Sequence, residues 1–99
     1  MSRPRYYWYG IVRKMIMRYP ALKEDNSKMA NEYVSAIEKT LDELKSLENA
    51  EYRAKAIKLV YFDKTRTIEG AAMELHYSSS SVARWLNKFV NDVGKKVGF

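Results

Sequence analysis

Apolar side chains recur every three or four residues along most of the chain, a spacing typical of amphipathic helices. The spacing predicts one helix over residues 5–19, a second that begins after Asn26 or Ser27, and a third over residues 50–62. Pro20 is expected to end the first helix, because proline interrupts a helix interior. The apolar positions expected to face inward are Trp8, Val12, Met15 and Tyr19, with Ile11 and Ile16 beside them; Met29, Tyr33, Ile37, Leu41 and Leu44; and Tyr52, Ala56, Leu59 and Val60.

Signals for β-strands are weak. No stretch alternates apolar and polar residues over several positions, and four Gly and two Pro offer few hairpin turns. The apolar run of residues 59–62 could form a buried strand, but the sequence shows no partner strand for it. We therefore expect an all-α fold.

Residues 67–86 have the spacing of a helix-turn-helix, a short helix joined to a second helix by a tight turn. Thr67 can cap the first helix and Ser78 the second, and Ala72 is small where the two helices would cross. His76 occupies the turn position where glycine is usual, so we expect it to adopt a positive φ. The positions expected to close the core are Leu75, Tyr77, Val82, Trp85 or Leu86, and Phe89. The same pattern also fits a helical hairpin that binds nothing.

The outward face of the second helix carries the candidate binding chemistry. It is small and polar at its start, which suits entry into a major groove ~12 Å wide, and Arg and Asn can read guanine and adenine. The candidates for base contact are Ser79, Ser80, Arg84, Asn87 and Lys88. The candidates for phosphate contact are Lys64, Arg66, Lys95 and Lys96. Any one of these side chains could instead be an ordinary solvated surface residue.

The charge distribution is consistent with a polyanionic partner. The chain has 99 residues, enough for one domain, and its formal net charge is +6. Residues 1–23 carry six basic and no acidic residues, and residues 52–99 carry nine basic and four acidic ones. Residues 24–51 carry eight acidic and three basic residues, so this segment is the wrong surface for phosphate.

Several function classes are disfavoured. The absence of Cys excludes disulfides and thiolate sites and favours a reducing, cytoplasmic setting. The one His has no partner at a catalytic spacing, so we expect no enzyme, no cofactor, no metal site and no small-molecule substrate. No apolar run is long enough for a membrane span.

The N-terminal segment allows a second way of binding nucleic acid. Tyr6, Tyr7, Trp8 and Tyr9 could stack on bases while Arg3, Arg5, Arg13, Lys14 and Arg18 hold phosphates. We favour core or interface packing for this segment, because aromatic residues on a helical stripe usually belong to a core or an interface.

The chain resembles the RinA and ArpU-like transcriptional regulators of bacteriophages that infect Gram-positive bacteria. The resemblance is strongest over residues 57–99 and rests on the segments 57–62, 67–75 and 93–99, together with Ser78, Val82, Arg84 and Trp85. It implies a small helical protein whose C-terminal half is similar to the promoter-reading region of sigma factors. It also implies activation of late phage genes in the cytoplasm of a bacterial host.

These inferences combine into one expectation. Residues 1–50 form an N-terminal helical layer used for the core or for oligomerisation, and residues 51–99 form the helix-turn-helix unit. We expect a sequence-specific regulator that binds double-stranded DNA, as a homodimer or as a monomer that contacts host RNA polymerase through its acidic face. The alternative is a DNA-packaging subunit, similar to a small terminase component, that uses the helix-turn-helix for assembly.

Overall fold

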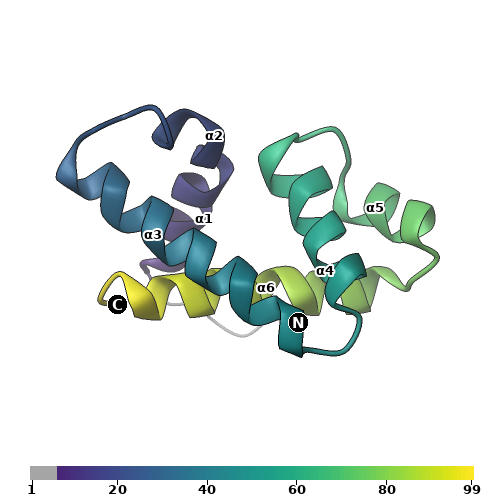
Figure 1. Ribbon diagram of the computed structural model, residues 1–99. Coiled ribbons are helices and arrows are strands. Elements are labelled where there is room, and N and C mark those ends of the chain that lie inside the picture. Colours follow the sequence, from purple (N-terminus) through teal and green to yellow (C-terminus); the bar gives the residue numbers. More distant parts are fainter. Residues whose placement is uncertain (1–6) are drawn as a thin grey trace.

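The computed structural model describes residues 7–99, and within this range every regular element is a helix (Figure 1). The expected helix start at residue 5, and the candidate contacts of Arg3, Arg5 and Tyr6, lie outside the described residues. The α-helices are α1 (Tyr9–Met17), α2 (Tyr19–Leu22), α3 (Lys28–Glu43), α4 (Ala50–Ile57), α5 (Ile68–Leu75) and α6 (Ser79–Lys96). A 3-10 turn, η1 (Leu44–Ser46), extends α3, and a π-helical segment, η2 (Lys58–Phe62), extends α4. The all-α prediction is confirmed, and the apolar run of residues 59–62 is helical.

The helix boundaries follow local sequence signals, with one exception. Ser27 caps α3, since its hydroxyl oxygen accepts a hydrogen bond of 3.2 Å from the Ala30 N–H. The prediction that Pro20 ends the first helix is wrong. The helix ends at Met17, and Pro20 lies in the first turn of α2, where a missing N–H leaves no hydrogen bond unmade.

The buried face of α3 differs from the predicted one. Met29, expected in the core, is 58% exposed, whereas Ala30 and Thr40 are buried beside the expected Tyr33 and Ile37. Thr40 satisfies its hydroxyl by donating to the Ala36 carbonyl at 2.7 Å. Small side chains on this face let α3 lie close to its neighbours, so shape decided the register more than hydrophobicity did. Ile11 and Tyr52, also expected to face inward, are 50% and 42% exposed.

Helix α6 is the element that both halves of the chain share. It packs against α1 and α3 from the N-terminal half and against α4 and α5 from the C-terminal half. Figure 1 shows α6 running beneath both groups of helices. Residues 7–50 and 51–99 therefore share a single hydrophobic core. Its largest fully buried apolar side chains are Val12, Ile16, Ile37, Ile57, Val82, Leu86, Phe89, Val90 and Val93.

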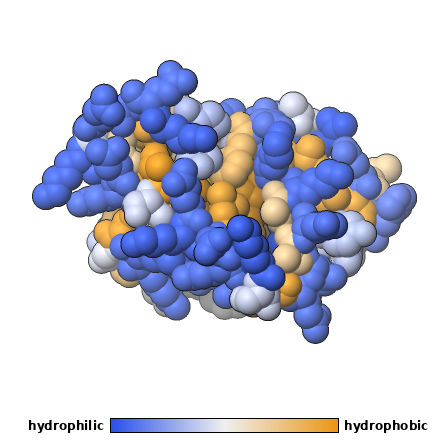
Figure 2. Space-filling model, viewed as in Figure 1, coloured by the Kyte–Doolittle hydropathy of each residue, from blue (hydrophilic) through white to orange (hydrophobic). Residues whose placement is uncertain are grey.

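The two groups of helices also touch away from α6. The rings of Tyr19 and Phe62 lie 4.8 Å apart and join α2 to η2, and the Lys64 ammonium donates to the Met17 carbonyl at 2.8 Å. Figure 2 shows an apolar band between the two groups, flanked by hydrophilic surface. In the described part of the chain, no helix is long and apolar enough to cross a membrane.

The start of α1 packs on the end of α6 through an aromatic contact. The Trp8 ring stacks on Phe99, with centroids 5.5 Å apart and planes 9° from parallel. The indole also lies against Gly94, where a Cβ atom would be only 2.4 Å from the Trp8 ring. The missing side chain at Gly94 is therefore what lets Trp8 lie against α6.

Candidate nucleic-acid interface

Residues 76–78 connect α5 to α6 in a tight turn whose geometry follows from three local signals. Thr67 caps α5 by accepting from the Gly70 N–H at 3.1 Å, and Ser78 caps α6 by accepting from the Ser81 N–H at 3.1 Å. His76 adopts the left-handed conformation, with φ 63° and ψ 39°. All three were predicted from the sequence: Thr67 fixes where α5 starts, and His76 and Ser78 fix where α5 ends and α6 starts.

Helix α6 is anchored by the residues expected to face inward. Leu75, Val82, Trp85, Leu86 and Phe89 are all buried, and Ala72 is buried where the two helices meet. Tyr77, half-buried, packs edge-on against Trp85 with ring centroids 4.9 Å apart. Its hydroxyl donates to the Asn49 side chain at 3.1 Å, which ties the turn to the start of α4. The first half of α6 is thus held rigidly against α4 and α5.

The opposite side of α6 forms a polar line that we call the outer stripe: Ser80, Arg84, Lys88, Asn91 and Lys95. Because each helical residue turns by about 100° and rises about 1.5 Å, these positions lie within about 40° of Arg84. Arg84 and Lys95 are about 16 Å apart along the axis by the same geometry. Both are exposed. Arg84 was predicted as a base contact and Lys95 as a phosphate contact, and the helix places both on one face.

The base candidates do not all lie on this stripe. Ser79, Ser80 and Arg84 are exposed near the start of α6, and within residues 7–99 no ion pair engages Arg84. Lys88 is exposed but forms an ion pair with Asp92, with 3.0 Å between Nζ and Oδ2.

The prediction that Asn87 contacts a base does not fit its position in the structure. The residue is half-buried, and its side-chain carbonyl accepts a hydrogen bond from the Tyr9 hydroxyl of α1. The amide is therefore committed to the contact between α1 and α6, on the edge of the outer stripe. We no longer count Asn87 among the base contacts, because reading adenine would require its carbonyl and its amino group to face the groove together.

The phosphate candidates differ in what holds them. The Lys64 ammonium donates to the Met17 carbonyl, Arg66 pairs with Glu74 at 2.9 Å, and Lys96 pairs with Glu43 of α3 at 2.9 Å. Lys95 is exposed on the outer stripe, and no ion pair within residues 7–99 engages it. The structure therefore groups Lys95 with Arg84 and places the other three cations in intramolecular contacts.

Two residues of this surface were missed by sequence reasoning. Asn91 lies on the outer stripe, and Asp92 holds Lys88. The spacing of four residues between Lys88 and Asp92 is the signal that could have identified the pair, because side chains at that spacing are neighbours on a helix.

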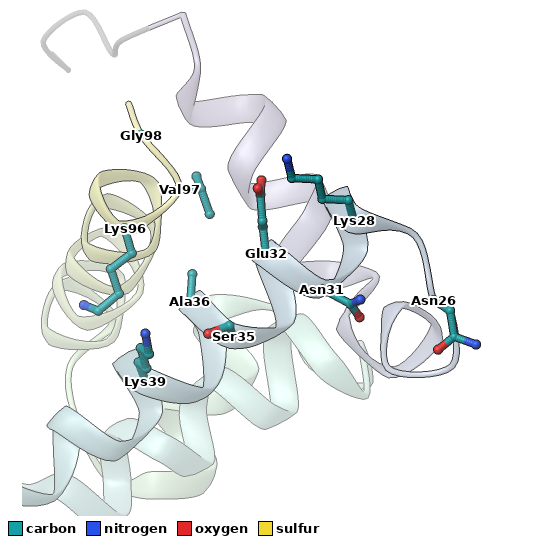
Figure 3. A pocket seen from close by; sticks show the side chains of 10 residues that line it. All are labelled: Asn26, Lys28, Asn31, Glu32, Ser35, Ala36, Lys39, Lys96, Val97 and Gly98. Atoms are coloured by element: carbon teal, nitrogen blue, oxygen red, sulfur yellow. The ribbon is translucent and has the colours of Figure 1, made fainter.

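A groove lies on another side of α6, between its C-terminal end and α3 (Figure 3). Its volume is about 1010 Å³. Its charged lining residues are Lys28, Glu32, Lys39 and Lys96. Lys96 is turned about 100° around α6 from Lys95, so the groove is not a continuation of the outer stripe. Among the described residues, no group of His, Asp or Glu side chains is placed to hold a metal ion.

A scan against models of known protein families finds no match, and searches of curated proteins and of solved structures find no similar protein. The geometry of α5, the turn and α6 is therefore the main guide to function.

Proposed function

We propose that this protein binds double-stranded DNA with α5 and α6 acting as a helix-turn-helix, and that it regulates transcription. The observation that carries the proposal is the exposed Arg84 on the outer stripe, one helical turn beyond a rigidly anchored, serine-only start of α6. In this arrangement α6 lies in the major groove and α5 crosses the DNA backbone behind it.

The start of α6 supports this docking. Ser79 and Ser80 are small and exposed, so the backbone of the first turn can approach a DNA strand closely. The free N–H groups and the positive end of the helix dipole there favour a phosphate. Arg84 then reaches base edges from the middle of the groove, and Lys95 lies about 16 Å along the axis, where a flanking backbone would pass.

A role in transcription is the part of the proposal that comes from the resemblance to RinA and ArpU-like phage regulators. The acidic segment of residues 24–51 forms α3, η1 and the beginning of α4, all on elements other than the outer stripe. This separation leaves the acidic helices available to a protein partner, such as RNA polymerase, while α6 holds DNA.

The test begins with selection of bound duplexes from a random library, followed by affinity measurements on the selected site and on random duplexes. Arg84→Lys keeps the charge but loses the paired hydrogen bonds that distinguish guanine, worth ~1–3 kcal/mol. We expect it to lower affinity for the selected site by about tenfold or more and to leave random DNA nearly unchanged. Arg18→Lys, the same change at an exposed position outside α6, is the matched control, because it keeps the charge that a phosphate contact at Arg18 would need.

Two results would contradict the proposal at different levels. Wild-type protein that binds neither selected nor random duplexes at low salt would refute DNA binding. Equal losses on both duplexes for Arg84→Lys would retain DNA binding and refute the base contact.

A further inference from the structure

One acidic side chain lies next to the proposed DNA-binding face and neutralises part of it. Asp92 follows Lys88 by one turn of α6, and its carboxylate lies 3.0 Å from the Lys88 ammonium. The Asp92 side chain is only 26% exposed, less than the carboxylate of any other ion pair in residues 7–99. The carboxylate is therefore held in place beside the outer stripe.

The pair is poorly placed to stabilise the helix. Glu or Asp four residues before a Lys favours a helix more than the reverse order, because the reverse order opposes the helix dipole. Here the cation comes first, and Asp92 is close to the C-terminal end of α6 at Lys96. Because the Lys88 side chain is 50% exposed, solvent screens the pair, and its contribution to the free energy of unfolding is small. The pair matters more for the charge of the outer stripe, because it neutralises one of the three cations there: Arg84, Lys88 and Lys95.

We propose that Asp92 limits the sequence-independent affinity of the outer stripe for DNA by keeping Lys88 paired, an inference that rests on the proposed DNA binding. Phosphate contacts act on every sequence alike, because each one releases counterions from the duplex. A protein with all three cations free would be retained on DNA of any sequence. With Lys88 paired to Asp92, Arg84 and Lys95 provide the attraction, and base contact decides where the protein stays.

The magnitude follows from counterion release. Freeing Lys88 to contact one more phosphate should steepen the slope of log affinity against log salt by ~0.9. Affinity for random DNA should then fall about 3.5-fold more between ~50 and ~200 mM salt than it does for the wild type. If the protein with Lys88 free and the wild type bind random DNA equally at ~1 M salt, the same difference in slope gives the former a roughly eightfold higher affinity at ~0.1 M salt.

The experiment compares wild type with Asp92→Asn, Asp92→Glu and Asp42→Asn, using fluorescence anisotropy of labelled random-sequence duplexes over a salt series. Asp92→Asn should show the steeper slope, and Asp92→Glu, which keeps the charge, should match the wild type. Asp42→Asn is the control. Asp42 pairs with Lys45 at 3.2 Å at the C-terminal end of α3, and removing its carboxylate changes the net charge by the same amount. The melting temperature of Asp92→Asn should stay at or slightly above that of the wild type.

The outcomes separate this inference from the proposed function. If Asp92→Asn and Asp42→Asn steepen the slope equally, only net charge matters and the role of Asp92 is overturned. A lowered melting temperature with an unchanged slope would show that Asp92 is structural, which also overturns it. Absence of wild-type binding to all duplexes would refute the proposed function itself.

Discussion

Replacing Gly94 by alanine should destabilise the protein, although alanine ordinarily stabilises a helix interior. Gly94 lies within α6, and a Cβ atom there would be 2.4, 2.9 and 3.0 Å from three atoms of the Trp8 ring. Atoms that close cannot coexist, so the indole must move. Trp8 is 8% exposed and stacks on Phe99, so any movement disturbs a packed contact.

The expected magnitude is a balance of two effects. The gain from replacing glycine in a helix is about 0.5–1 kcal/mol. Forcing an extra methyl group into a packed site costs about 1–3 kcal/mol, and expelling the indole altogether would approach the ~3–5 kcal/mol of a Trp→Ala change. If the indole stays in place, the two effects leave a net loss of about 0–2.5 kcal/mol, with about 1 kcal/mol as the central value. Each kcal/mol lowers the melting temperature by about 4–8 °C in a domain of this size.

The assay is thermal and urea unfolding followed by helical circular dichroism. Gly10→Ala is the matched control, because nothing lies within 4 Å of a Cβ atom at Gly10 and only the helical gain should appear there. In a Trp8→Ala background the clash is absent, so Gly94→Ala should become stabilising. If Gly94→Ala alone stabilises the protein as much as Gly10→Ala does, the close packing of Trp8 on α6 is refuted.

Two further predictions follow from local contacts. Ser78→Ala removes the oxygen that accepts from the Ser81 N–H, so it should lower the free energy of unfolding by ~1 kcal/mol. Ser79→Ala, at a neighbouring exposed position, is the control and should leave the free energy of unfolding unchanged. Equal unfolding midpoints for the two variants would contradict the cap. Burial and the 2.8 Å hydrogen bond to Glu38 raise the pKa of Tyr19 to about 12 from 10.0, so its contribution to stability should be complete below pH 10 and be lost as the pH rises through about 12. The ultraviolet titration difference between wild type and Tyr19→Phe measures this pKa directly, and Glu38→Gln should lower it; an unchanged value would show that the bond to Glu38 has no part in the shift.

The starts of α3, α5 and α6, the α5–α6 turn and the inward face of α6 could be predicted because each depends on neighbours in the sequence. The caps at Ser27, Thr67 and Ser78 each bond an N–H three residues along, and His76 needed only its own backbone angle. The buried face of α3 could not be predicted in the same way. It carries Ala30 and Thr40, whose burial depends on how closely other helices approach, and that distance is a property of the assembled core.

The candidate site likewise has features that depend on local sequence and features that depend on tertiary contacts. The sequence by itself determined that Arg84 lies on the outward side of α6, because helical periodicity alone places it there. Only the tertiary structure decided which cations are engaged by distant parts of the chain. Lys96 pairs with Glu43 and Lys64 bonds the Met17 carbonyl, contacts that join residues 53 and 47 positions apart, and Asn87 is held by Tyr9 from the other end of the chain. Such contacts form only when the chain folds, because no local rule brings those side chains together.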